Sequence, residues 1–169
     1  YKWDEGSQAY KRTKTAEDRF AITLEISGDF SPSKLSGQAY TADVWHWKSS
    51  RSEPAGVAHD KVWKVDTKPF PKGKAFKTSD GKTVYLSRKS DKGSRLYKSV
   101  KYDAKDQDIM PRYKVNMSPR GSIADVKTKA VWRDGYWHLE IARKLNTGNA
   151  DDAVIPANGS IQIAIAAVD

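Results

Sequence analysis

The side chains best suited to chemistry lie in one short stretch, Ala42–Lys48, which holds two of the six Trp and one of the three His. Successive side chains of a strand point to opposite faces. Trp45 and Trp47 would therefore share one face, and His46 would point to the other. The stretch predicts either a well-packed structural strand or the wall of a site for a flat ligand.

Four side chains could ligate a metal ion: His46, His138, Met110 and Met117. Each His is flanked by large apolar residues of the opposite strand face, and neutral imidazole binds iron well. A single strand His is more often structural, and Met is more often core filler. Both Met lie near Pro and polar residues, however, where filler is less needed. The residues alone leave ligation and packing both open.

Classical catalysis finds little support in the sequence. There is no Cys, which excludes disulfides, zinc–thiolate sites, iron–sulfur clusters and covalent c-type haem. We find no nucleophile elbow, P-loop, dinucleotide fingerprint or metalloprotease helix, and we expect that the chain is not an enzyme. The Asp residues of Tyr102–Asp108 have some calcium-like spacing but lack the Gly and Glu of an EF-hand. We expect a solvated acidic loop there.

The positive charge is concentrated in one segment, Lys64–Lys101. The chain carries a net charge of +9, and this segment has twelve Lys or Arg against three Asp, so the remainder is neutral. Such a segment suggests an anionic partner, such as an acidic protein, a polyanion or phosphate. The alternative is a solvated, Lys-rich insertion. The segment has no recognised nucleic-acid motif, which argues against nucleic acid as the partner.

The strong periodic signals have period two. They predict strands over Phe20–Ile26 and Ala39–Lys48, a hairpin with its turn at Asp134-Gly135, and a last strand over Ile161–Ala167. Weaker strands are expected at 61–65, 82–87 and 96–102. No segment has a helical repeat of useful length. The pattern predicts an all-β fold, a sandwich of about eight to ten strands.

The length and polarity of the chain fit one domain. A chain of 169 residues can bury a real core, and the mean hydropathy is −0.75. No apolar run is long enough to cross a bilayer. The sequence begins at Tyr1 without Met. We therefore expect residues 1–169 to be a single domain taken from a longer protein or complex.

Two ordered blocks resemble a known family. The first block begins with Asp43-Val44-Trp45-His46-Trp47-Lys48 and continues with Arg51, Pro54-Ala55-Gly56 and Asp60. The second comprises Gly121–Val126, Trp132, Asp134-Gly135, Trp137, Glu140, Arg143, Leu145, Thr147-Gly148 and Asp151-Asp152, with Ala166–Asp169 closing the match. Together they resemble the haem-binding domain typified by the ethylbenzene dehydrogenase gamma subunit.

The resemblance implies an immunoglobulin-like β-sandwich, akin to family 9 carbohydrate-binding modules, that holds haem b and passes electrons in the periplasm or elsewhere outside the cytoplasm. In gamma-subunit members Met and Lys are the axial ligands. The corresponding Met region, Leu35–Tyr40, has no Met here. The Lys ligand should fall near Tyr136–Arg143, where His138 can stand in for it.

Two functional hypotheses follow. The first is a b-type haem electron-transfer domain, with His138 as one ligand and His46, Met117 or Met110 as the other. Its partners would be an acidic redox protein or other subunits of an oxidoreductase. The second is a haem-free module on the same fold, which docks carbohydrate or protein through exposed aromatic faces. Polyanion binding by the basic segment is a weaker third reading.

Overall fold

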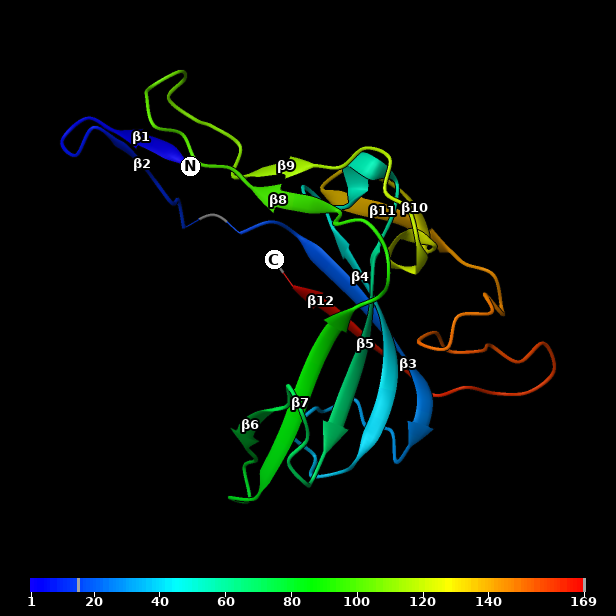
Figure 1. Cartoon of the computed structure of the whole chain (residues 1–169). Coiled ribbons are helices and arrows are strands. Elements are labelled where there is room, and N and C mark those ends of the chain that lie inside the picture. Colours follow the sequence, from blue (N-terminus) through cyan, green and yellow to red (C-terminus); the bar gives the residue numbers. More distant parts are fainter. Residues whose placement is uncertain (15, 169) are drawn as a thin grey trace.

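The computed structural model describes residues 1–14 and 16–168, which form twelve strands and two 3₁₀ turns (Figure 1). Six strands build one large antiparallel sheet in the order β12-β3-β4-β5-β7-β6, and the others form three two-stranded hairpins. The strands are β1 Lys2–Asp4, β2 Ala9–Lys11, β3 Arg19–Gly28, β4 Tyr40–Lys48, β5 His59–Asp66, β6 Lys74–Lys77, β7 Thr83–Ser90, β8 Tyr97–Ser99, β9 Tyr113–Val115, β10 Lys127–Arg133, β11 Tyr136–Ala142 and β12 Ile163–Val168. The turns are η1 Glu53–Ala55 and η2 Ser122–Ala124.

The predicted all-β class and the strongly periodic strands are confirmed. β3, β4, β12 and the β10–β11 hairpin lie where the alternation placed them, and the hairpin turns at Asp134-Gly135. The φ angles there are 55° and 81°, the left-handed values that a two-residue hairpin turn requires. The β1–β2 hairpin was not predicted, because two three-residue strands carry too little alternation to be recognised.

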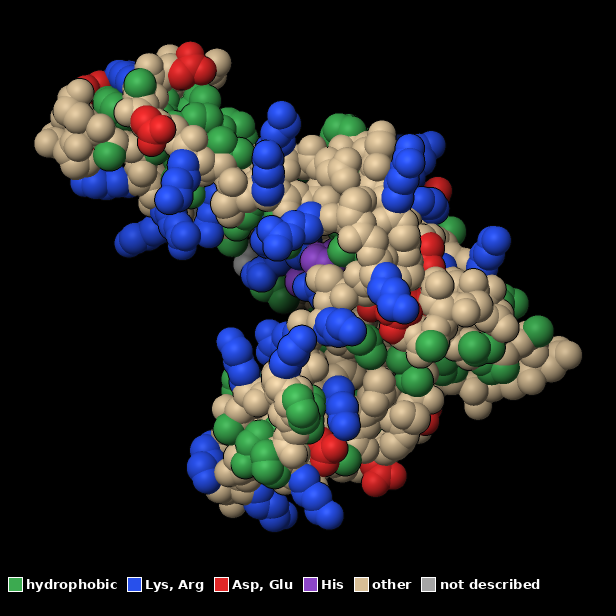
Figure 2. Space-filling model, viewed as in Figure 1, with side chains coloured by type: hydrophobic (Ala, Val, Ile, Leu, Met, Phe, Trp, Pro, Cys, Tyr) green, Lys and Arg blue, Asp and Glu red, His purple; other side chains and the backbone are tan. Residues whose placement is uncertain are grey.

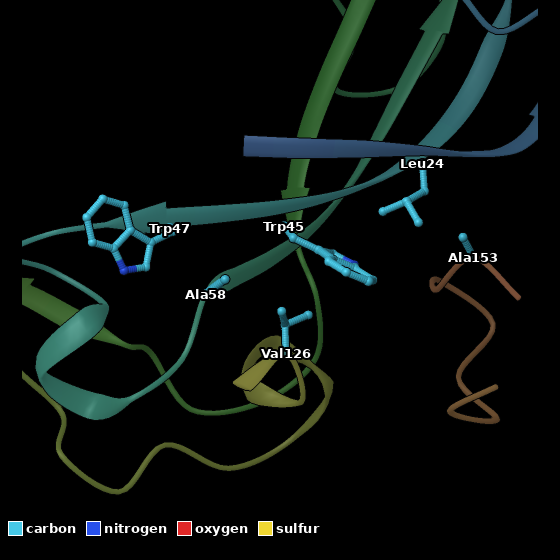
Figure 3. Close-up of a cluster of buried hydrophobic side chains, with 6 residues drawn as sticks. All are labelled: Leu24, Trp45, Trp47, Ala58, Val126 and Ala153. Carbon is cyan, nitrogen blue, oxygen red and sulfur yellow. The ribbon is translucent and has the colours of Figure 1, made fainter. Parts of the chain in front are cut away.

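One face of the large sheet packs against the β10–β11 hairpin, which makes the two layers of a sandwich. Trp45 and Trp47 of β4 lie on this face and are buried, so the packing reading of the Trp pair is confirmed. The rings of Trp47 and Trp137 meet edge to face, with centroids 5.1 Å apart. Figure 3 shows Trp45 directed from the sheet toward Val126, with Leu24 and Ala153 nearby. Apolar burial of this kind is the main source of the fold's stability.

A half-buried carboxylate connects the two layers. Glu53 of η1 accepts hydrogen bonds from Trp47 Nε1 at 2.6 Å, from Thr128 Oγ1 at 2.8 Å and from the Ala130 backbone N–H at 2.7 Å. The first donor belongs to the sheet and the others to β10. Glu53 therefore fixes the hairpin over the same end of β4 that carries the Trp pair.

The opposite face of the large sheet is covered only in part. Around β4, β5 and β7 it carries a second apolar cluster, formed by Phe30, Tyr40, Ala42, Val65, Val84 and Leu86. Farther along the same strands the face carries His46 and Lys48 of β4 and His59 and Lys61 of β5. The β8–β9 hairpin flanks this second region through Tyr97.

Within the described ranges, no helix is long and apolar enough to cross a membrane. The loop from Asn146 to Asn158 has no strand, as its Asn, Asp, Gly and Pro content predicts. Asp103, Asp106 and Asp108 are exposed, as expected for a solvated acidic loop.

Candidate functional site

A basic hollow lies on the face of the large sheet that is turned away from the β10–β11 hairpin. We define it by His46 and Lys48 of β4 and His59 and Lys61 of β5. His46 and His59 are direct cross-strand partners, and Lys61 pairs with Val44 two residues away. Figure 2 shows His side chains at the bottom of a depression in the middle of the molecule, with Lys and Arg around it. Strand alternation places these four side chains on one face, because each is two residues from its neighbour of the same strand.

The two His of the hollow differ in their hydrogen bonds. His59 is buried and uses both ring nitrogens, with Nδ1 3.1 Å from Lys48 Nζ and Nε2 2.8 Å from Ser90 Oγ. The Tyr97 ring packs edge-on against His59, with centroids 6.0 Å apart. His46 is half-buried, and among the described residues no hydrogen bond engages its ring. His59 is therefore fixed in place, whereas the nitrogens of His46 are free to bind a ligand.

Burial and mutual repulsion keep the nitrogen bases of the hollow unprotonated. Burial, followed by the charges of Lys48 and Lys61, lowers the pKa of His46 to about 3 and that of His59 to about 2. Burial, followed by Lys61 and Arg51, lowers the pKa of Lys48 to about 6. Both imidazoles and the Lys48 amine are therefore neutral at pH 7. Each neutral imidazole has one nitrogen with a lone pair, and that of His46 is available to a ligand in the hollow.

The rim of the hollow remains cationic. Burial lowers the pKa of Lys61 only to about 8. Arg51 is anchored by Glu17 and lies over the rings of Tyr97 and Tyr113, at 5.0 and 4.9 Å. Arg19 of β3 pairs with Lys48 across the sheet. A ligand that enters the hollow would meet neutral nitrogen donors at its floor and positive charge at its edge.

The structure does not bring the predicted ligands together. His138 lies on β11, paired with Val131, and it is exposed because its neighbour Trp137 takes the inward position. His46 lies on β4 and points away from the β10–β11 hairpin, into the basic hollow on the other face of the large sheet. One iron atom cannot lie within reach of both side chains. Met117 is exposed to 62%, and Met110 lies beside the N-terminus, where its carbonyl accepts a bond from the Tyr1 amine.

Sequence reasoning did not single out His59 or Lys48. His59 sits at the first position of a weakly periodic strand, so no local pattern pairs it with His46. The sequence shows only that His59 and Lys61 alternate with Asp60, which puts the two basic side chains on one face of a strand. Pairing it with the basic positions of β4 requires the register of the β4–β5 hairpin, which a single sequence does not supply.

An acidic cluster lies on the other face of the same strands. We define it by Asp43 of β4, Asp60 of β5, and Asp91, Asp125 and Asp152 of the connecting segments. Arg143 enters it just after β11. Its Nη1 lies 2.5 Å from Asp43 Oδ2 and 3.6 Å from both Asp60 Oδ2 and Asp152 Oδ1.

The guanidinium is the only Lys or Arg group paired with the acidic cluster in the described ranges. It also donates to the Ala153 carbonyl at 2.6 Å and lies 4.7 Å from the Trp45 ring. Burial, together with the neighbouring Asp43, raises the pKa of Asp60 to about 11. Burial and the nearby Asp151 raise that of Asp91 to about 8. Arg143 alone does not balance five carboxyl groups.

A third feature is an aromatic cavity of about 690 Å³ at the end of the sandwich. Trp47, Trp132, Tyr136 and Trp137 line it together with Phe20. Trp132 and Tyr136 are 57% and 72% exposed, so their rings are accessible to a partner. Exposed, fixed aromatic faces are typical of sites that stack on sugars or dock proteins.

The basic segment Lys64–Lys101 spans the end of β5, β6, β7 and β8. Two of its groups, Lys64 and Arg88, stack on aromatic rings, Phe70 at 4.7 Å and Trp63 at 5.2 Å. Most of its other cations are exposed, which is visible as the Lys and Arg scattered over the lower part of Figure 2.

Comparison with known proteins places the chain in a family. The family model described as ethylbenzene dehydrogenase matches residues 1–169. No curated protein and no solved structure is a significant match. The matched region includes the Trp-His-Trp strand and the β10–β11 hairpin, the two blocks that carry the sequence resemblance. The chain belongs to the ethylbenzene dehydrogenase family.

Proposed function

We propose that the chain is a haem b-binding electron-transfer subunit or domain of an oxidoreductase, and that His46 in the basic hollow is a ligand of the haem iron. Family membership fits a subunit that works with other subunits of such an enzyme. The observation that carries the proposal is the neutral His46 ring, whose nitrogens are free, on the floor of a hollow with a cationic rim.

The donor set of the hollow fits haem. Iron in haem is held by neutral imidazole or another soft or nitrogen donor, and His46 offers that donor at any pH above about 3. The two haem propionates need cationic partners, and Arg19, Arg51 and Lys61 supply them at the rim. The haem would contribute one-electron chemistry. The protein would hold it, balance its charge and set the polarity around it.

His59 and Lys48 would act on the site from beside His46. Their contact at 3.1 Å and the Ser90 hydrogen bond fix the floor of the hollow. Their amine and imidazole stay neutral because burial lowers both pKa values, and because a further charge would be repelled by Lys61 and Arg51. We assign both a positioning role, and we assign His138 no role in iron binding.

The exposed cations of Lys64–Lys101 support a proposal about the partner. Their positive electrostatic potential would steer an acidic redox protein or subunit toward the domain. Such steering raises the association rate and makes that rate sensitive to salt. By analogy with the family, we place this exchange outside the cytoplasm, in the periplasm or its equivalent.

Reconstitution with haemin tests the assignment. The purified chain is mixed with haemin, freed of excess haemin, and its visible spectrum is recorded oxidised and reduced. We expect a Soret band that sharpens on reduction, and we expect His46→Ala to weaken or shift it. The matched control is His138→Ala, which removes an exposed imidazole of the outer hairpin face and should leave the spectrum unchanged.

Two results would overturn parts of the proposal. Absence of a Soret band with added haemin would remove haem binding. Loss of the band in His138→Ala, with His46→Ala intact, would move the ligand to the hairpin and reject the basic hollow as the site.

The aromatic cavity favours a second candidate function, a haem-free module that docks carbohydrate or protein. Trp132 and Tyr136 present accessible rings next to the buried Trp47–Trp137 pair. Retention on immobilised polysaccharide that Trp132→Ala abolishes and His46→Ala leaves intact would support this function. Equal retention of the wild-type and Trp132→Ala chains would reject the cavity as a sugar site.

A further inference from the structure

The acidic cluster contains far more acceptor oxygen than its own partners satisfy. Six buried carboxylate oxygens have no hydrogen-bond partner among the described residues. They are Asp43 Oδ1, Asp60 Oδ2, Asp91 Oδ1 and Oδ2, Asp125 Oδ1 and Asp152 Oδ1. A buried acceptor without a partner costs about 1–3 kcal/mol, and more when it is charged. A cluster left in this condition would be strongly destabilising.

Arg143 does not remove this deficit. Its short contact goes to Asp43 Oδ2, which already accepts from the Ala153 backbone N–H at 2.9 Å. Its 3.6 Å separations from Asp60 Oδ2 and Asp152 Oδ1 are too long for hydrogen bonds. One guanidinium carries a single positive charge, so the other carboxyl groups of the cluster must be neutralised by protons, as the raised pKa values of Asp60 and Asp91 indicate, or by a bound cation.

The unpartnered oxygens converge from separate elements. Asp43, Asp60 and Asp152 each offer one oxygen atom, and these atoms lie within 4.8 Å of one another. Asp91, which is only 6% exposed and has both oxygens unpartnered, adds its charge to the same cluster from the segment after β7. Asp91 is an independent indication, because it is buried against Asp60 and points to a missing positive partner rather than to solvent.

The geometry points to a structural binding site for a divalent cation of the Ca²⁺ type, formed by Asp43, Asp60 and Asp152 and supported by Asp91 and Asp125. The donor set is entirely carboxylate oxygen, with no imidazole or thiol, which favours a hard ion over zinc or copper. Ca²⁺ accepts six to eight oxygens in irregular geometry. Asp43, Asp60 and Asp152 supply three of these oxygens, and water or the neighbouring carboxyl groups would supply the others without an octahedral cage.

The ion has a route to the cluster from two sides. Asp91 lines a cavity of about 610 Å³ together with His59, Leu96 and Tyr97. Asp125 and Arg143 line another of about 400 Å³, beside Thr147 and Asn149. Thr147 Oγ1 donates to Asp152, and Asn149 Nδ2 donates to both Asp125 and Asp152. These bonds orient the two carboxyl groups at the mouth.

The bound ion would join segments that are far apart in the chain. Asp43 and Asp60 belong to the large sheet, Asp125 follows η2, and Asp152 belongs to the long loop between β11 and β12. That loop has no strand of its own and relies on such contacts for its position. The ion would therefore stabilise the closed sandwich.

Terbium luminescence and calcium titration test the site. The chain is first treated with a chelator and dialysed. Tb³⁺ is then added with excitation of Trp, because Trp45 lies 4.7 Å from the Arg143 guanidinium at the cluster. We expect sensitised Tb³⁺ emission that Ca²⁺ displaces, and a higher melting temperature in Ca²⁺ than in chelator.

Asp91→Asn is the diagnostic variant, since it leaves the contacts of Arg143 with Asp43, Asp60 and Asp152 in place. We expect its affinity for Ca²⁺ to fall by about tenfold or more, equivalent to about 1.4 kcal/mol. Asp106→Asn, in the exposed loop with calcium-like spacing, is the matched control and should bind as the wild type does. Near-ultraviolet circular dichroism checks that each variant is folded, and Asp125→Asn replaces Asp91→Asn if the latter is not.

The absence of both Tb³⁺ emission and a calcium-dependent melting shift would overturn the inference, and would mean that protons alone neutralise the cluster. Equal Ca²⁺ affinity in the wild type and Asp91→Asn, with loss in Asp106→Asn, would also overturn it, because the ion would then bind the exposed loop.

Discussion

The basic hollow and the acidic cluster lie on opposite faces of the same strands, but their buried charges are neutralised in different ways. The basic hollow and the acidic cluster alternate along β4 and β5, with Asp43 and Asp60 on one face and His46 and His59 on the other. The floor of the hollow loses its charge, because His46, His59 and Lys48 give up their protons. The acidic cluster keeps a cation, Arg143, and needs more positive charge still.

This difference follows from the chemistry of the groups. His is already close to neutral at pH 7, so two buried imidazoles can stay uncharged at modest cost. Lys and carboxyl groups become neutral only when burial shifts their pKa by about three units or more, Lys by releasing a proton and a carboxyl group by taking one up. The imidazoles of the hollow are therefore open to a ligand, whereas the carboxyl groups of the cluster need protons or a cation. The variants below test this contrast.

Removal of Arg143 should have the largest effect. Arg143→Met leaves the acidic cluster without its guanidinium, and uncompensated buried charge of this kind costs about 3–5 kcal/mol. We expect that loss in the free energy of unfolding by urea at pH 7. Arg133→Met, at the exposed end of β10, is the control and should change stability by about 0.5 kcal/mol or less. Similar effects of the two substitutions would show that Arg143 does not hold the cluster.

The corresponding change in the basic hollow should have the opposite sign. Lys48→Met replaces a buried amine, whose proton is lost on folding, by an apolar side chain of similar length. It also removes the contact with His59, which costs about 1–3 kcal/mol. Because the deprotonation of Lys48 on folding costs more than this near pH 6, we expect a net gain of roughly 1–4 kcal/mol by urea unfolding at pH 6. A loss comparable to that of Arg143→Met would contradict the contrast between the two regions.

The pH dependence of stability should also run in opposite directions. The pKa of Lys48 falls on folding from 10.5 to about 6, so its contribution to stability is lost as the pH falls through that window. The pKa of Asp91 rises from 3.8 to about 8, so its contribution is lost as the pH rises through that window. Each effect approaches about 1.4 kcal/mol per pH unit.

Unfolding measured from pH 5 to 10 in chelator checks this prediction. The free energy of unfolding that Lys48→Met gains over the wild type should be greatest near pH 6 and should decrease toward pH 10. The free energy of unfolding that Asp91→Asn gains should be smallest near pH 5 and greatest above pH 8. Gains that change with pH in the same direction for both variants would contradict the predicted difference between the two regions.

The smallest effect should separate the two His of the hollow. His59→Ala removes both of its hydrogen bonds and leaves Ser90 and Lys48 without their partner, at a cost of about 1–3 kcal/mol. His46→Ala removes a half-buried ring without hydrogen bonds and should cost clearly less. Thermal unfolding of the two apo variants provides the measurement. A larger loss for His46→Ala would mean that its ring is structural and not free for a ligand.

Much of the fold was predictable because alternation is a local property. Phe20 to Ile26 and Trp137 to Ile141 show period two strongly enough to place β3 and β11, and Asp134-Gly135 marks the turn. The same rule placed Trp45 and Trp47 on one face, but it left packing and ligand binding both open. The short strands β1, β2 and β6 have too few residues, or too few buried ones, to carry the signal.

The sites were less predictable, because they depend on register and on contacts between distant residues. Nothing near His46 in the sequence indicates that it faces away from His138, or that His59 stands beside it. The same holds for Arg143, which meets carboxyl groups up to 100 residues away.

The sequence by itself determined the all-β class, the faces of the best strands and the excess of positive charge, since each depends on residue types at short spacing. Only the tertiary structure decided which ionisable groups share a face. The sandwich carries His138 to one outer surface and His46 to the other, and it gathers five Asp around a single Arg. Pairing of strands over long separations sets these neighbours, and the burial that follows sets their protonation.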